Sequence, residues 1–119
     1  MVLKSYAKIN LTLSIKNKLR SGLHNIQSIY CLINLHDKIF LKKNKNKYFD
    51  QVSFTGPFSK DINKSNNSVK KVLKVMRKNK IIHDYYSIKV SKKIPVFAGL
   101  GGGTSNAATL LKHLSLIHI

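Results

Sequence analysis

Apolar and polar residues alternate along the first fifteen positions, a pattern typical of a β-strand with one buried face. The predicted strand spans residues 3–15, and from residue 9 onward one side carries only apolar residues, with Asn10, Thr12 and Ser14 on the other side. The apolar side consists of Ile9, Leu11, Leu13 and Ile15. We therefore expect a half-buried strand here.

A polar connection that contains glycine follows at residues 16–23 and leads to a second extended run at 24–35. Asp37 then predicts a turn before a short strand at 38–41, and a further short strand is expected at 51–55, closed by a Gly-Pro pair. Two long and two short strands are thus predicted in the first half of the chain.

The second half shows helical spacing. Asn66 and Asn67 are good N-cap residues, and after them an apolar stripe recurs at i, i+3, i+4 and i+7 until about residue 80. Its members are Val69, Val72, Leu73 and Met76. Alternation returns at 86–90, and a second helical pattern begins near residue 107. Strands with two helices in this order describe a small α+β layer.

Length and composition limit what this layer can belong to. The chain has 119 residues, with 20 Lys, 2 Arg, 4 Asp and no Glu, so the net charge is +18. This length suits one domain at most, or a piece of a larger one. The lone Cys31 excludes an internal disulfide, and no Cys/His spacing suits zinc. No stretch is apolar enough for a membrane span and no signal segment is visible, so a cytoplasmic protein is expected.

The charge has two interpretations. A strongly basic chain suggests a nucleic-acid partner, but nucleic-acid readers favour Arg, and here Lys outnumbers Arg by 20 to 2. Lys, Asn and Ile, which all have codons rich in A and T, make up 44 of the 119 residues. We therefore attribute much of the basicity to genome composition, and nucleic acid is not an expected partner.

Four of the six glycines lie at 99, 101, 102 and 103, between a predicted strand and a predicted helix. Bare backbone lets successive N–H groups converge on an anion, and the start of a helix adds partial positive charge. Thr104 and Ser105 add hydroxyl donors at the same place. A flexible turn would need only one or two glycines, so this segment predicts phosphate binding.

The glycine segment is neither a Walker loop nor a Rossmann fingerprint, because the Lys and the spacing that they require are absent. Instead PVFAGLGGGTSNAA resembles the ATP loop of the GHMP kinase superfamily. That resemblance implies an α+β fold, the GHMP-kinase N-terminal domain, which is a ribosomal-protein-like α/β sandwich with a left-handed βαβ crossover. It also implies ATP with Mg²⁺ as co-substrate.

Three further blocks resemble one family of these kinases, the 4-diphosphocytidyl-2-C-methyl-D-erythritol kinases of non-mevalonate isoprenoid synthesis. They are SYAKINLTLSI, GLHNIQSIYCLINLHDKI and NNSVKKVLKVMRK, in the order of the family. The resemblance implies transfer of the γ-phosphate of ATP to the 2-hydroxyl of that cytidine-containing small molecule. Another GHMP kinase, such as a mevalonate or homoserine kinase, is the alternative enzyme, and a basic RNA- or DNA-binding module is the alternative from another class.

The resemblance also assigns residues to the ATP site. It places the glycine loop around the phosphates and puts Asn67, Lys92 and Asn106 near the adenine or the triphosphate, although Lys92 and Lys93 could also be a solvated pair at a strand end. The loop residues are Pro95, Val96, Phe97, Ala98, Gly99, Leu100, Gly101, Gly102, Gly103, Thr104 and Ser105.

For the transfer step and the substrate, the resemblance implies four residues. Lys8 would lie beside the substrate hydroxyl and the moving phosphoryl group, and Asn10 would orient substrate hydroxyls. His24 would read the cytosine ring, and Tyr30 would pack on it. Leu23 stands where the family usually has Tyr, and Ser21 stands where it usually has Asp. The cytosine platform is therefore expected to be less aromatic.

The family also uses an Asp as general base, in a segment about two dozen residues beyond the glycine loop. The aspartates of this chain are Asp37, Asp50, Asp61 and Asp84, none in such a segment, and no carboxylate suits a metal ion. We therefore expect residues 1–113 to be a partial ATP-binding domain without the C-terminal GHMP domain and without turnover alone. Residues 114–119, LSLIHI, resemble a translated sequencing adapter and are expected to be a non-native tail. The oligomeric state is not indicated.

Overall fold

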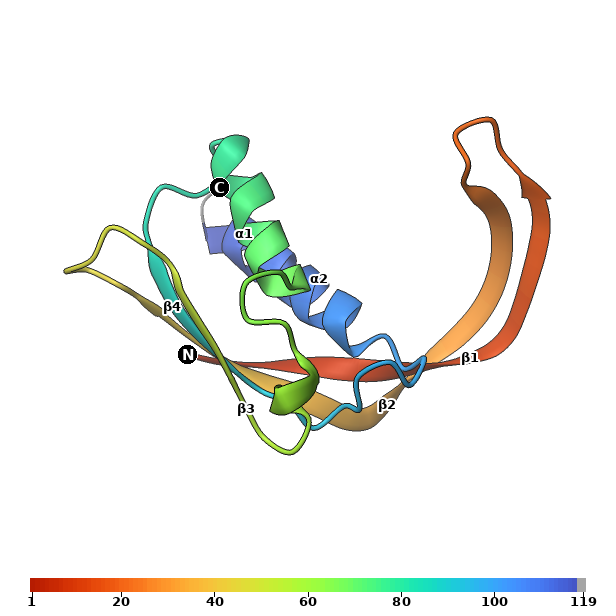
Figure 1. The fold of residues 1–119 in the computed structure, drawn as a ribbon, viewed down its shortest axis with the longest axis horizontal. Coiled ribbons are helices and arrows are strands. Elements are labelled where there is room, and N and C mark those ends of the chain that lie inside the picture. The colour runs from red at the N-terminus through yellow and green to blue at the C-terminus, as the bar shows by residue number, and fades with distance from the viewer. Residues whose placement is uncertain (118–119) are drawn as a thin grey trace.

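The structure, a computed structural model, describes residues 1–117. Within them, four strands form one sheet, and two α-helices cover one of its faces (Figure 1). Neither helix has the length and apolar character needed to cross a membrane. The elements are β1 (Val2–Lys18), β2 (His24–Lys43), β3 (Gln51–Thr55), the short 3-10 helix η1 (Ser59–Asp61), α1 (Ser68–Lys78), β4 (Tyr86–Ser91) and α2 (Gly102–Ile117).

The sheet has the strand order β1-β2-β4-β3. β1 pairs antiparallel with β2, and β2 pairs antiparallel with β4, whereas β3 and β4 run parallel and are joined through α1. Parallel neighbours need such a crossover, and a helix is its usual form. The expected α+β layer is confirmed.

The apolar stripe of α1 faces the sheet as predicted. Val69, Leu73 and Met76 are buried, and Val72 packs at the edge of the same core. Asn67 caps the helix, because its side-chain oxygen accepts the N–H of Lys70 at 3.0 Å. The N-cap bond and the stripe together fix where the helix begins and which side it buries.

α2 supplies the other side of the core. Leu110 and Leu114 are fully buried against residues of β2, β4 and α1. The helix continues through Ile117, so four residues of the expected tail lie in α2 and the first belongs to the core. Residues 118–119 lie outside the described residues. The non-native origin of 114–119 stays a prediction.

Beyond the helices, β1 and β2 continue as a long curved hairpin arm that leaves the body of the molecule (Figure 1). We call residues 9–32 the arm. The expected half-burial of β1 is wrong for the described residues, because no second layer reaches this part of the hairpin. Ile9, Leu11, Leu13 and Ile15 are all exposed. They do not share one face either, because the register shift between Asn10 and Thr12 interrupts the alternation.

The turn expected at Asp37 is also absent. β2 runs unbroken past this residue, which pairs with Ser5 of β1 and is fully buried. A carboxylate can occupy a buried strand position only where charged and hydrogen-bonding partners surround it. Asp37 has such partners, and they lie under the glycine segment.

Candidate functional site

The glycine segment connects β4 to α2 without regular structure. Gly99 and Gly101 have φ of +74° and +68°, values that a residue with a Cβ adopts only under strain. The N–H of Ser105 donates to the carbonyl of Gly101 at 2.9 Å, one turn back. The amides of Gly102, Gly103 and Thr104 therefore precede the helical hydrogen-bond ladder and are available to a ligand.

Two of these glycines also lie against the sheet, Gly102 against the branched side chain of Ile94 and Gly101 against the flexible side chain of Lys8. A Cβ on Gly102 would lie 2.9 Å from Cγ2 of Ile94, and a Cβ on Gly101 would lie 2.8 Å from Cε of Lys8. At Gly99 nothing lies within 4 Å of such a Cβ, so this glycine faces open space. The segment is thus pressed against the sheet on one side and open on the other.

Two cavities meet at this segment. One, of about 260 Å³, is lined by Ile62, Lys92 and residues 95–104. The other, of about 250 Å³, lies between β1, β2 and the start of α2. It is lined by Tyr6, Lys8, Tyr30, Leu32, Gly101, Thr104, Ser105 and Ala108. Because Gly101 and Thr104 line both cavities, a molecule in one can touch a molecule in the other.

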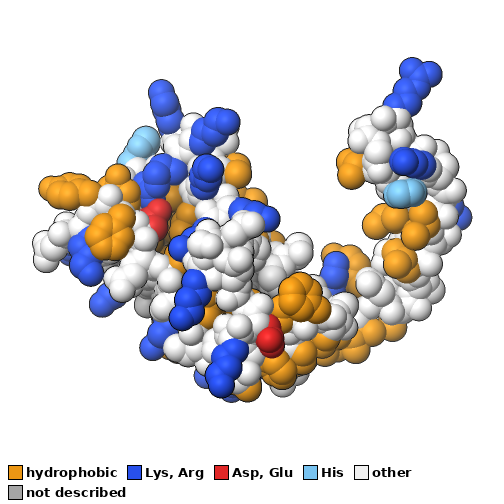
Figure 2. All heavy atoms as spheres, viewed as in Figure 1, with side chains coloured by type: hydrophobic (Ala, Val, Ile, Leu, Met, Phe, Trp, Pro, Cys, Tyr) orange, Lys and Arg blue, Asp and Glu red, His pale blue; other side chains and the backbone are white. Residues whose placement is uncertain are grey.

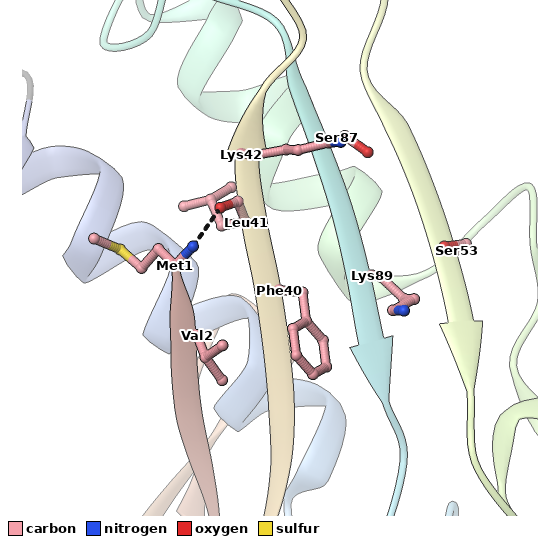
Figure 3. A pocket seen from close by; sticks show the side chains of 8 residues that line it. All are labelled: Met1, Val2, Phe40, Leu41, Lys42, Ser53, Ser87 and Lys89. Carbon is pink, nitrogen blue, oxygen red and sulfur yellow. Dashed lines mark hydrogen bonds between the residues drawn. The ribbon is translucent and has the colours of Figure 1, made fainter.

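A larger cavity of about 390 Å³ lies on the strands themselves, with Val2, Phe40 and Lys89 on its walls (Figure 3). Its remaining walls carry hydroxyl groups and Lys42 and hold no His, Cys or carboxylate side chain. The sequence motifs do not reach it. The candidate site is therefore the pair of cavities at the glycine segment.

Lys8 joins β1 to the glycine segment. Its N–H donates to the carbonyl of Leu100 at 2.9 Å, because the pairing of β1 with β2 shifts register between Tyr6 and Lys8. Such irregularities free a backbone group from the ladder. The Lys8 ammonium lies 5.4 Å from the centre of the Tyr30 ring, a cation–π distance. The sequence assigned these two residues to the site separately, and the structure brings them together.

Beneath the segment lies a buried ion pair. The ammonium of Lys92 lies 2.5 Å from Oδ2 of Asp37, and both side chains are almost fully buried. Oδ1 of Asp37 accepts the N–H groups of Lys93 and Ile94 at 2.7 and 2.9 Å. Asp37 thus ties β2 to the chain that enters the glycine segment.

Asn106 of α2 extends this network. Its side-chain oxygen accepts from the Lys92 ammonium at 3.1 Å, and its amide donates to Asp37 at 3.1 Å and to Ser5 at 2.8 Å. The Ser5 hydroxyl in turn donates to the hydroxyl of Ser105 at 2.8 Å. Among the described residues, every buried side-chain nitrogen and oxygen has a partner.

Lys92 and Asn106 therefore lie under the segment that was expected to hold the phosphates, bonded to Asp37. The sequence analysis missed Asp37 and Ser5 as parts of this site. A carboxylate inside an apolar alternation, in a chain with only four carboxylates, was the signal that could have found Asp37.

Asn67, expected near the nucleotide, caps α1, and its side-chain amide donates to the carbonyl of Asn63 at 2.9 Å. The next residue, Ser68, reaches the glycine segment directly, because its hydroxyl donates to the carbonyl of Gly103 at 2.9 Å. The N-terminus of α1 thus meets that of α2, a contact that no sequence motif indicated.

The residues assigned to the cytidine end are not brought together. His24 pairs with Lys18 at the far end of the arm, whereas Tyr30 pairs with Asn10. Tyr30 comes six residues after His24, about 20 Å along an extended strand. Asn10 accepts a hydrogen bond from the Ser28 hydroxyl at 3.2 Å. In this structure, one cytosine ring of a substrate cannot contact both His24 and Tyr30.

Comparison with known proteins identifies the family that has this fold. Residues 67–118 match the model of the GHMP kinases N terminal domain. A 4-diphosphocytidyl-2-C-methyl-D-erythritol kinase of Pelagibacter ubique is 46% identical over 110 residues, which are 92% of this chain and 38% of that protein. A kinase with the same name from Finegoldia magna is 36% identical over 97% of this chain and 40% of its own length. The chain thus spans about two-fifths of the relatives that it matches.

Solved structures show the same fold. A crystal structure of 4-(cytidine 5'-diphospho)-2C-methyl-D-erythritol kinase superposes with a TM-score of 0.73 and 25% identity, over 99% of this chain and 41% of that one. Homoserine kinase from Cytophaga hutchinsonii gives a TM-score of 0.57 at 18% identity, over 92% of this chain and 32% of its own, which shows the fold alone. The chain therefore belongs to the GHMP kinases and corresponds to part of their N-terminal domain.

Proposed function

We propose that this chain binds the triphosphate of ATP at its glycine segment. We further propose that, in a protein of its relatives' length, it serves transfer of the γ-phosphate to the 2-hydroxyl of 4-diphosphocytidyl-2-C-methyl-D-erythritol. One observation carries the proposal: Lys8 lies directly against Gly101, in a cavity shared with Thr104 and Ser105. The names of the relatives support the choice of substrate.

The phosphates would lie at the start of α2. There the amides before the helical ladder and the hydroxyl of Thr104 can donate, and the helix end carries about half a unit of positive charge. Gly101 and Gly102 allow the backbone to lie this close to Lys8 and Ile94. The buried pair of Asp37 and Lys92 would hold the segment in that shape, with Lys92 in the lining of the same cavity.

Lys8 would act where the two cavities meet. Its ammonium, held over the Tyr30 ring, is placed to offset negative charge on the attacking oxygen and on the phosphoryl group as it moves. Asn10 follows Lys8 by two residues on the same side of β1, and we retain it with Tyr30 and His24 as proposed substrate contacts. Because about 20 Å of strand lies between His24 and Tyr30, they would contact different parts of a long substrate.

Magnesium would enter as part of the nucleotide. The described residues contain no cluster of three His, Cys or carboxylate side chains that could hold a metal ion. Three of the four aspartates are held in ion pairs, Asp37 with Lys92, Asp50 with Arg77 and Asp84 with Lys43. The fourth, Asp61, lies in η1. The side chains of residues 1–117 thus do not fit a resident metal.

The same pairings bear on proton removal from the hydroxyl. Asp37 is fully buried and bonded to Lys92, so its carboxylate cannot reach a substrate. We therefore propose that residues 1–117 bind nucleotide, and that the general base lies in a part of the longer kinase not represented among them. Turnover by this chain alone is not expected.

Titration calorimetry with ATP at about 0.15 M salt tests the binding step. We expect saturable binding that Lys8→Ala weakens and that Lys89→Ala leaves unchanged, since Lys89 lines the separate cavity of about 390 Å³ on the strands. Equal losses in the two variants, or binding that vanishes at moderate salt, would reduce the interaction to general charge attraction.

The transfer step needs a longer protein. Residues 1–113 can replace the matching segment of the Pelagibacter relative, with which this chain is 46% identical. The chimaera should phosphorylate the cytidine-containing substrate, and Lys8→Ala should lower kcat about 100-fold or more while the Lys89→Ala control stays active. A chimaera that binds both substrates but is insensitive to Lys8 would contradict the assigned role.

Nucleic-acid binding is not favoured as an alternative. The relatives are named as kinases, and the lysines are spread over the body and the arm instead of gathering on one part of the visible face (Figure 2). The homoserine kinase neighbour shares the fold only. The kinase proposal is therefore the one that we carry forward.

A further inference from the structure

We infer that Phe97 provides the stacking surface for the purine ring of the nucleotide whose phosphates the glycine segment binds. The inference rests on the proposed function and adds a residue that recognises the base. Three observations carry it: the backbone conformation of Phe97, its exposure, and its place in the cavity that contains the glycine amides.

The backbone of Phe97 is strained. Its φ is +62°, and among the described residues Lys80 is the other non-glycine residue with positive φ. Lys80 follows the C-cap of α1, and its N–H bonds back to Arg77, so it ends a helix in a common way. Phe97 ends no helix, and a bulky side chain in the left-handed region is an outlier that points to function.

Within residues 1–117, the Phe97 side chain makes almost no contact that could compensate this strain. The Phe97 side chain is 96% exposed, so its ring buries almost no surface within the chain. A strained residue normally persists because surrounding contacts hold it. A ring held in solvent by a strained backbone is instead placed to meet something that arrives from solution.

The lining of the cavity indicates which kind of molecule Phe97 would meet. This lining combines the apolar side chains of Ile62, Pro95, Val96 and Phe97 with the backbone of residues 101–104. A nucleoside triphosphate likewise combines a flat apolar base with phosphates. Aromatic side chains stack on bases through their π-faces, so the geometry matches Phe97 to the base.

The experiment compares ATP with inorganic tripolyphosphate, which has the phosphates without the base, in titrations of the 119-residue chain. Phe97→Asn removes the ring and substitutes a residue that tolerates positive φ, and Phe97→Tyr keeps an aromatic face. Tyr48→Asn is the matched control, because Tyr48 is 89% exposed and does not line the cavity.

We expect Phe97→Asn to weaken ATP binding by about 5- to 150-fold and to leave tripolyphosphate binding unchanged. Phe97→Tyr should bind ATP as the parent does, and Tyr48→Asn should have no effect. The urea midpoint of Phe97→Asn should not fall, because strain is relieved. A structural role would lower that midpoint and weaken both ligands together.

The inference is overturned if Phe97→Asn weakens ATP and tripolyphosphate equally, or weakens neither. In both cases the parent chain still binds ATP, so the proposed function survives. If the parent chain binds neither ligand, the proposed function fails first, and the role of Phe97 fails with it.

Discussion

Replacing Asp37 with Asn should destabilise this chain far more than a change of one surface charge. The carboxylate is fully buried and accepts from the Lys92 ammonium, from Asn106 and from two backbone amides. Removing its charge leaves a lysine whose side chain is 2% exposed without a counter-ion. Breaking one side of a buried pair costs about 3–5 kcal/mol, out of a total stability of about 5–15 kcal/mol.

Urea unfolding followed by circular dichroism measures this loss. Asp84→Asn is the control, because Asp84 also pairs with a lysine but both side chains are about half exposed, and such pairs contribute about 0–1 kcal/mol. The double variant Asp37→Asn with Lys92→Met should recover much of the loss, since no unpaired charge remains buried. If Asp37→Asn costs no more than Asp84→Asn, the buried network does not hold the glycine segment.

Three further predictions concern other parts of the chain. Gly102→Val should abolish ATP binding in calorimetry and lower stability in urea by about 1–3 kcal/mol, because its Cβ would lie 2.9 Å from Ile94. Burial first, and nearby carboxylates second, raise the pKa of Tyr86 above 10.0. The stability that this residue contributes is therefore present below pH 10 and lost as pH rises through the folded pKa, and Tyr86→Phe should flatten that decline in urea midpoints measured from pH 9 to 11. Leu13→Lys on the arm should change the unfolding free energy by less than about 0.5 kcal/mol, whereas Leu110→Ala in the core should cost about 2–5 kcal/mol.

Local patterns predicted the elements whose burial is decided nearby. The stripe of α1 and its Asn67 cap were found because period and capping chemistry both act within one turn. The short strand at Gln51–Thr55 was found from alternation and the Gly-Pro pair that follows it. Asp37 misled the same reasoning, since its partners lie 55 and 69 residues away in Lys92 and Asn106, and no local rule can represent them.

The same contrast between local patterns and partners distant in sequence applies to the candidate site. The glycines and the hydroxyls of Thr104 and Ser105 follow one another along the chain, so the motif located them. The contact of Lys8 with Gly101 depends on the register shift in β1, and the bond from Ser68 to Gly103 depends on how α1 meets α2. Sequence could name the parts of the loop, whereas the residues beneath it and beside it required the sheet.

The arm separates two questions that alternation treats as one: whether a strand face is to be covered, and what covers it. Near its start β1 lies under α2, and Ser5 and Ala7 are fully buried there. Beyond Lys8 the alternation in the sequence continues to Ile15, yet the apolar residues are 41–65% exposed, because no element of residues 1–117 lies over them. The register shift between Asn10 and Thr12 also places Ile9 and Leu13 on opposite faces. Alternation therefore predicted an extended strand correctly, but the half-burial that it implied is not met within these residues. Both the register shift and the extent of the second layer depend on partners distant in sequence, which a local pattern does not represent.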